Sequence, residues 1–398
     1  SRVESMTRLL PIVCLFLSEA TLAEAANQKS EMQELTSYQQ YQAWLENLLL
    51  ELGADGQFDP KKGIDWSVMP GPFYTPEKKF GIGVSAVGLY KPDINDIDSQ
   101  PSSITVNGFG SINGAYGVSI NNANYLNNDK YRLFVDAELT DSPDVFHGLG
   151  VDAGMHNERV NYDRRSYSAS ITGMTRVLPF TYLGLGLSFF HNEASNAKQE
   201  NTHIPWIGDD FAEFPSTQRN IGGMLNLTYD SRDFALNASK GRLIELEYQH
   251  FSTELGSDND FERVRLNYSD YRSLSSIPGV LAWQIRSESN FGDVSWDQMA
   301  MLGGAEALRG YEQGQYRGRN MLISQVEYRQ PLSGRHGMVY WLGAGTLAEE
   351  FAQLGQDEWL YSVGVGYRFE IKQRVNLRLD IGFGNDQSGF YFAINEAF

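Results

Sequence analysis

A single arginine in a long polar segment offers the first place where the chain could do chemistry. Arg309 stands in the motif Leu308-Arg309-Gly310-Tyr311, within residues 293–318. In the stretch that follows, residues 319–331, Glu327 and Arg329 share one face of an alternating pattern. A loop tip that brought Arg309 to Glu327 away from water would form a charge-assisted pair, and removing one partner of such a pair costs about 3–5 kcal/mol. These residues therefore predict a loop tip that acts as a buried brace or lid.

Nucleophilic catalysis would need a nucleophile beside a base, and the sequence offers no such pair. No Gly-x-Ser-x-Gly elbow is present, and the six histidines are scattered: His147, His156, His191, His203, His250 and His336. Acidic runs such as Asp93, Asp96 and Asp98 could bind a divalent cation through carboxylate oxygens, or could simply be exposed loop residues. We therefore expect no enzyme activity, no cofactor and no dedicated metal site.

Residues 1–25 have the form of a secretory signal peptide. Arg8 precedes the apolar run 9–17, and Ala23-Glu24-Ala25 has the A-x-A form of a cleavage site. This apolar run is too short to span a bilayer as a helix. The only cysteine, Cys14, lies inside the segment, so the exported chain would contain neither a disulfide nor a thiolate metal site. The net charge of −18 provides no basic face for phosphates, which argues against nucleic-acid binding.

Residues 26–78 are predicted to form a periplasmic helix followed by a linker. Residues 31–52 carry apolar side chains at helical spacing, among them Tyr38, Leu45 and Leu52. The linker is rich in Gly, Pro and Lys and is expected to be irregular. The helix could plug the periplasmic mouth of the barrel that residues 79–398 are predicted to form, lie on the inner leaflet or pair with a partner. The sequence leaves these three alternatives open.

From residue 79 to residue 398 the period changes to two, which predicts an all-β fold. Residues 361–370 are the clearest example, because Tyr361, Val363 and Val365 alternate with small and charged residues. The pattern predicts sixteen antiparallel strands, an even number that lets the first and last strands pair and close a transmembrane barrel. The expected strands are 79–91, 103–111, 115–125, 130–141, 146–157, 164–177, 181–192, 218–230, 241–254, 260–273, 279–292, 319–331, 337–348, 358–370, 374–384 and 387–398.

The end of the chain favours an outer-membrane barrel over a soluble β-sandwich, which also alternates. Phe392, Ile394 and Phe398 share one phase of the last predicted strand, and this is the form of an outer-membrane insertion signal. The expected location is the outer membrane of a Gram-negative cell. The expected partners are membrane lipid and lipopolysaccharide, with the barrel-assembly machinery during insertion. Short turns such as those at 178–179 and 385–387 would then be periplasmic.

Three groups of residues resemble the BamA/TamA superfamily of outer-membrane assembly and translocation barrels. The first is the Leu308–Tyr311 motif, similar to the Arg-Gly-aromatic tip of that family's sixth extracellular loop. The second contains Asp230, Arg232 and Asp233 and ends at Gly241, and it is similar to the family's turn between strands eight and nine. The third runs through Arg368, Arg378 and Asp380. The resemblance covers residues 79–398.

The resemblance implies that the Arg309 loop folds into the lumen and that Glu327 anchors it there. The family usually has an Asp at the place where this chain has Gly343, which implies a weaker clamp or one that rests on Glu327 alone. Residues 26–78 hold one predicted helix and no POTRA domain, as in the short POTRA-less members.

The implied function is outer-membrane biogenesis or translocation of a protein or lipid client, with a seam between the first and last strands that opens. The alternative is a passive channel or a structural surface barrel whose lumen is plugged by a loop. The sequence fixes neither the client nor whether the protein is a homo-oligomer.

Overall fold

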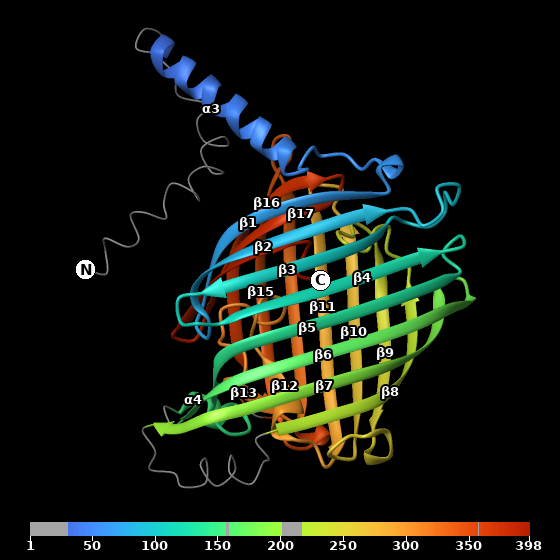
Figure 1. The fold of residues 1–398 in the computed structure, drawn as a ribbon, viewed down its shortest axis with the longest axis vertical. Helices are drawn as coiled ribbons and strands as arrows, with labels where there is room; N and C mark the ends of the chain where they lie inside the picture. The colour runs from blue at the N-terminus through green and yellow to red at the C-terminus, as the bar shows by residue number, and fades with distance from the viewer. Residues whose placement is uncertain (1–30, 157–158, 201–216, 357) are drawn as a thin grey trace.

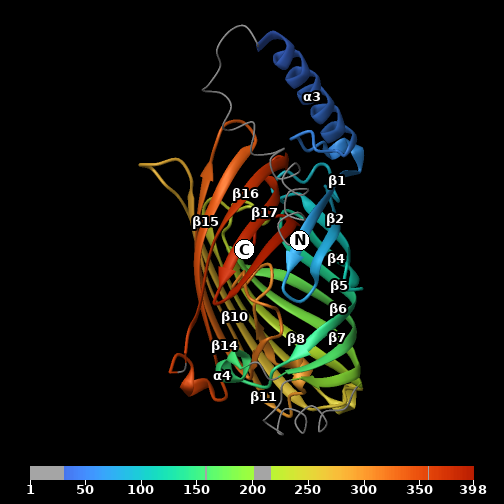
Figure 2. The same cartoon turned by 90° about the vertical axis from the view of Figure 1, so that its left-hand side faces the viewer.

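The computed structural model describes residues 31–156, 159–200, 217–356 and 358–398. Within these residues, sixteen antiparallel strands form a closed barrel, and β12 pairs with β13 in a separate two-stranded sheet. The predicted fold class is therefore confirmed. Helix α3 (Glu31–Glu51) projects from one end of the barrel, here called the helix end, while β12, β13 and α4 (Val151–Met155) lie toward the opposite loop end (Figures 1 and 2).

The barrel wall is built from strands of 8 to 20 residues. In chain order they are β1 (Ile64–Thr75), β2 (Lys79–Tyr90), β3 (Ser102–Ser111), β4 (Tyr116–Leu126), β5 (Tyr131–Phe146), β6 (Arg159–Leu178), β7 (Thr181–Glu200), β8 (Thr217–Asp230), β9 (Gly241–Phe251), β10 (Phe261–Ser273), β11 (Val280–Gly292), β14 (Asn320–Pro331), β15 (His336–Ala348), β16 (Leu360–Lys372), β17 (Val375–Gly384) and β18 (Gln387–Ile394).

Shorter elements lie in the connections between these strands. They are β12 (Ala300–Leu302), β13 (Tyr316–Gly318) and the 3₁₀ turns η1 (Pro60–Lys62), η2 (Thr253–Leu255), η3 (Trp296–Gln298) and η4 (Phe351–Gln353). Among the residues described, no helix combines the length and the apolar character needed to cross a bilayer.

The alternating sequence produces two different faces of the wall. On β7, Leu183, Leu185 and Leu187 point outward and are half or more exposed. The residues between them are small, and Ser188 is buried on the luminal side. An outward apolar face without a protein partner is the arrangement expected of a strand that contacts lipid.

One predicted strand is absent and one observed strand was not predicted, so the predicted number of sixteen still agrees with the structure. Residues 146–157 were expected to form a strand, but β5 ends at Phe146 and α4 follows after Gly148 and Gly150, which both have positive φ. The supposedly irregular linker contains β1, so the barrel begins at Ile64 and not at residue 79. The Pro and Gly content of this segment suggested a loop, but proline is tolerated in a strand at the edge of a sheet.

Two further differences concern the end of the chain. The sequence predicted the turns 178–179 and 385–387 at one periplasmic end, and this is wrong. Because strand directions alternate along the chain, the turn 385–386 lies at the loop end, opposite the turn 179–180. The last strand stops at Ile394, where Asn395 takes a φ of +76°, so Phe398 is not part of the wall. The predicted insertion signal is thus divided between β18 and the segment that follows it.

Candidate functional site

The Arg309 side chain lies fully buried in the barrel lumen, in the connection between β11 and β14. Its Nη1 donates to Asp380 Oδ2 at 2.6 Å, and its Nη2 donates to Glu327. The guanidinium also lies 3.7 Å from the centroid of the Trp341 ring. The structure therefore confirms that Arg309 of the loop and Glu327 of β14 form a pair. Three strands of the barrel wall hold the loop tip through these side chains: β14 with Glu327, β15 with Trp341 and β17 with Asp380.

The Arg309 pair belongs to a larger buried network of charges. Glu327 also accepts from Arg329 at 3.1 Å, while Asp380 also accepts from Arg368 at 2.6 Å and from Arg378 at 3.2 Å. Each carboxylate thus has more than one guanidinium partner, which offsets the cost of removing it from water. This network, together with Glu396, whose carboxylate lies 2.8 Å from Arg368 Nε, is called the arginine cluster below.

The rest of the loop motif is explained by close packing against β17 and β18. Gly310 has a φ of +111°, and a Cβ there would come within 2.7 Å of the backbone of Phe383. Its N–H donates to the Tyr391 hydroxyl at 2.8 Å, and the Tyr311 hydroxyl donates to the carbonyl of Tyr361 at 2.8 Å. Leu308 is buried in the apolar cluster behind the tip. Only glycine fits at position 310.

Gly343 does not leave the clamp resting on Glu327 alone, as the sequence suggested. A Cβ at Gly343 would lie 3.6 Å from Leu308 Cδ1 and 3.6 Å from Gln325 Cβ, so the position faces the loop beside the arginine. The second carboxylate comes instead from Asp380 on β17. The sequence placed Asp380 in a motif but did not predict that it pairs with Arg309. The reason is that β14 and β17 are not neighbouring strands, so nothing in the sequence pattern links Glu327 and Asp380 to the same guanidinium.

The seam between β1 and β18 is the weakest junction of the wall. A single pair, Tyr74 and Phe390, is in register there. The ladder between β17 and β18, by comparison, runs from Leu377–Ile394 to Gly384–Gln387. The described structure therefore closes at this junction with little help from backbone hydrogen bonds.

The sequence of β1 explains the missing ladder. Alternate residues of an antiparallel strand point their backbone groups to opposite neighbours. Val68 donates its N–H to the carbonyl of Leu52 and not to β2, so residues in its phase face the seam. Pro70 and Pro72 share that phase and have no N–H to donate. The edge of β1 that faces β18 thus lacks donors over its central part.

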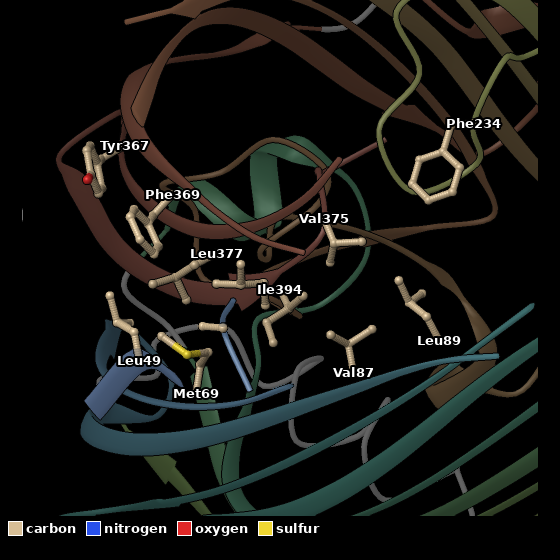
Figure 3. Close-up of a cluster of buried hydrophobic side chains, with 12 residues drawn as sticks. Leu49, Met69, Val87, Leu89, Phe234, Tyr367, Phe369, Val375, Leu377 and Ile394 are labelled. Atoms are coloured by element: carbon tan, nitrogen blue, oxygen red, sulfur yellow. The ribbon is translucent and has the colours of Figure 1, made fainter. Parts of the chain in front are cut away.

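Apolar overlap replaces the ladder toward the helix end. Tyr391 reaches the lumen, so Phe392 and Ile394 lie on the opposite face of β18. This face packs against the inner side of β1 and β2, and a Cβ on Gly71 would overlap the Phe392 ring. Figure 3 shows Ile394 and Leu377 opposite Met69 and Val87. Burial of these side chains is the main force that closes the seam.

A segment at the helix end connects both sides of the seam, and we call residues 52–65 the staple. Gly56 donates its N–H to the carbonyl of Ile371 at 2.9 Å, and Arg335 donates to the carbonyl of Ala54 at 2.7 Å. The buried Lys372 ammonium lies 2.7 Å from Asp55 and 3.0 Å from Asp65. Burial alone would raise the pKa of Asp55, but its hydrogen bond with Lys372 leaves that pKa below the usual value.

The predicted turn motif also lies at the helix end, between β8 and β9. Asp230 accepts from Arg232 Nε at 2.9 Å and from Arg132 Nη1 at 2.7 Å. Asp233 accepts from the backbone N–H of Ser239 at 2.9 Å and from Arg374 Nη2 at 2.9 Å. Gly241 has a φ of +94°, and a Cβ there would overlap the carbonyl of Ser231.

The Asp233 contact joins the β8–β9 turn to the turn between β16 and β17. Phe234 of the same turn packs into the apolar cluster at the seam. Burial acts to raise the pKa of Asp233, but hydrogen bonds from Ser239 and the Arg374 charge hold it below its ordinary value. The turn motif therefore covers the helix end of the lumen.

The acidic runs have structural partners of their own. Asp96 accepts from the N–H and hydroxyl of Ser99, and these bonds outweigh burial and lower the pKa of Asp96 to about 2. Within the described ranges, no group of three or more His, Cys, Asp or Glu side chains is placed to hold a metal ion. The predicted signal peptide, residues 1–25, lies outside the described residues.

Comparison with known proteins places this barrel in a family. The model of the Omp85 superfamily domain matches residues 102–398, whereas no curated protein matches the sequence. The structure of BamA from Haemophilus ducreyi lacking POTRA domains 1–3 has a TM-score of 0.53 and 16% identity, over 83% of this chain and 70% of that chain. CdiB from Acinetobacter baumannii has a TM-score of 0.53 and 13% identity, over 83% of this chain and 59% of that chain. The chain belongs to the Omp85 superfamily.

Proposed function

We propose that the protein acts in outer-membrane biogenesis or in translocation of a protein or lipid client, and that the seam between β1 and β18 opens for that client. The observation that carries the proposal is the single residue pair in register at this junction. Membership of a superfamily that contains assembly and secretion barrels supports it. Opening the seam breaks few backbone bonds and exposes mainly apolar surface, which lipid or an apolar client can cover.

The open edge of β1 would favour a particular kind of partner. Pro70 and Pro72 offer carbonyl oxygens but no N–H groups, so a client strand would have to donate hydrogen bonds at these positions without receiving any there. Such an edge binds a strand and releases it more readily than a complete ladder would. The staple keeps the helix end of β1 attached to the β16–β17 turn meanwhile.

A disulfide across the seam tests the proposal. In a Cys14→Ser background, Tyr74→Cys with Phe390→Cys should form a bond that shuts the seam, because these residues are paired. The matched control is Ala86→Cys with Val106→Cys, a pair in the β2–β3 ladder. The assays are the folding rate of an unfolded β-barrel protein in vesicles carrying each variant and the rate of lipid exchange between leaflets.

Oxidation should slow one of these rates only in the seam variant, and reductant should restore it. Equal rates for oxidised and reduced seam variants, in vesicles where the wild-type protein accelerates either process, would show that the seam has no part in the activity.

The same proposal includes a location and partners. We place the protein in a Gram-negative outer membrane, exported by a signal peptide at residues 1–25, with lipopolysaccharide and lipid around the wall. We assign it no enzymatic role. Insertion would use the barrel-assembly machinery. That machinery would recognise Phe392 and Ile394 before these side chains become buried in the seam. A homo-oligomeric state remains a prediction.

A passive channel is the second candidate, and one observation favours it. The lumen contains a cavity of about 820 Å³ lined by polar side chains from both halves of the barrel, among them Asn107, Asp136 and Glu247. If the Arg309 loop is a lid over this cavity, Arg309→Ala should raise single-channel conductance in planar bilayers. Unchanged conductance in that variant would argue against the channel and leave the seam proposal standing.

A further inference from the structure

The last four residues described, which we call the inward segment (Asn395–Phe398), enter the lumen instead of extending β18. The positive φ of Asn395 ends the strand, and its N–H donates to the carbonyl of Asn376 at 2.8 Å. Ala397 is buried, and the Phe398 ring packs against the apolar cluster of Ala238, Tyr271 and Ala282. The segment thus runs from β18 to the wall formed by β10 and β11.

Two buried arginines hold the inward segment through its polar atoms. Arg368 Nε donates to both carboxylate oxygens of Glu396, at 2.8 and 3.1 Å. Arg329 Nη2 donates to the backbone oxygen of Phe398 at 2.7 Å, and its guanidinium lies 5.3 Å from the Phe398 ring centroid. Asn376 Nδ2 adds a bond of 2.8 Å to Glu396. Both ends of a Glu-Ala-Phe sequence are therefore recognised by side chains of the barrel.

The site has more binding capacity than the inward segment uses. In the described structure, Arg329 Nη1, Arg368 Nη2 and Arg378 Nε are buried and have no hydrogen-bond partner. These three side chains are at most 7% exposed. The arginine cluster has four guanidinium groups for three carboxylates, one of which is Glu396. Without Glu396, the four guanidinium groups would share only the carboxylates of Glu327 and Asp380.

The inward segment also borders open space. All four of its residues line the luminal cavity, together with Tyr271 and Arg378. A peptide that occupied this cavity would lie directly beside the site. The attached segment competes with such a peptide at an effective concentration in the millimolar range, so the site is filled by its own chain unless the segment leaves.

We propose that this part of the lumen is a binding site for peptide segments with a carboxylate two residues before an aromatic ring, and that residues 395–398 occupy it as an internal ligand. Arg368 and Asn376 select the carboxylate, while Tyr271 and Arg329 select the aromatic residue. The inference goes beyond the proposed function, because the site needs no opening of the seam.

Removing the internal ligand tests the proposal. The probe is a fluorescein-labelled Asn-Glu-Ala-Phe peptide, and its binding to refolded protein is followed by fluorescence anisotropy. The variant lacking residues 395–398 should bind this peptide roughly tenfold to a hundredfold more tightly than a peptide with Gln in place of Glu, because a charge-assisted bond is lost. The full chain should bind neither peptide in the same concentration range.

Two further variants separate the site from general effects. In the shortened protein, Arg368→Gln should abolish the preference for the Glu peptide, whereas Arg286→Gln, a luminal arginine outside the arginine cluster, should leave it unchanged. If the shortened protein gives no heat-dependent mobility shift, the full-length double variant Glu396→Gln, Phe398→Ala replaces it, because its weakened segment can be displaced. Folded protein of either kind that binds neither peptide, or binds both equally, overturns the proposal.

Discussion

Replacing Glu327 by Gln should destabilise the barrel more than replacing Arg309 by Met, although Glu and Gln are alike in size. The reason is the charge balance among the side chains of the arginine cluster, in which four guanidinium groups face three side-chain carboxylates. Loss of Arg309 leaves equal numbers of the two charges. Loss of the Glu327 carboxylate leaves four buried cations with two anions.

The magnitudes follow from the partners that remain. After Arg309→Met, Glu327 keeps Arg329 at 3.1 Å and Asp380 keeps Arg368 at 2.6 Å, so we expect a cost near the lower limit for a broken buried pair, about 3 kcal/mol. After Glu327→Gln, both Arg309 and Arg329 lose a charged partner, and we expect about 5 kcal/mol.

Urea unfolding in phospholipid vesicles measures both values through tryptophan fluorescence, to which Trp341 beside Arg309 contributes. Arg286→Met is the control, because it removes a luminal arginine that lies outside the arginine cluster. If Arg309→Met costs as much as Glu327→Gln, or more, then the network is not governed by charge balance and the argument from excess cations is wrong.

Three further changes test other parts of the structure. Lys372→Met should lower the free energy of unfolding by about 3 kcal/mol, because Asp55 and Asp65 of the staple lose their buried cation. Since the staple then holds the seam less firmly, maleimide should label a cysteine placed at Met69 faster. Lys62→Met, which removes a half-exposed partner of the same two carboxylates, should change either quantity little. Gly310→Ala should cost roughly 2–3 kcal/mol by urea unfolding. Gly334→Ala, which shares a positive φ of +62° but has open space around its Cβ, should cost only the backbone strain, about 1 kcal/mol. Burial, with the nearby charges of Glu77 and Asp144, raises the pKa of Glu312 to about 7, so its folded form favours the proton. Stability from this group is therefore complete below pH 4.5 and lost as the pH rises through 7; Glu312→Gln should flatten that part of the pH–stability curve, and an unchanged curve would contradict the assignment.

Much of this fold follows from local pattern. The alternation of residues 361–370 and its repeats determine an antiparallel wall with one apolar face, because a strand turns successive side chains to opposite sides. Helix α3 ends at Glu51, within one residue of its predicted end. The errors occurred where pattern and context disagree. Residues 64–75 contain the loop-like run Pro70-Gly71-Pro72, yet they form a strand because that strand lies at the seam.

The sequence alone could also have indicated the seam through one signal that we did not use. Val87 and Leu89 are apolar in the luminal phase of β2, where polar or small residues are the rule. Such a departure indicates that another part of the protein covers the face, but it does not say which part. That the outer face of β18 fills this role is visible only in three dimensions.

By itself, the sequence determined that the chain forms a barrel wall, that Glu327 and Arg329 face the lumen, and that a glycine follows Arg309. Only the tertiary structure decided that Asp380 is the second partner of Arg309, that the staple reaches Lys372, and that Phe398 turns inward. The physical reason is that periodicity reports which face a side chain occupies. The identity of its partner depends on strand order, loop paths and the balance of buried charge, which join residues far apart in the chain.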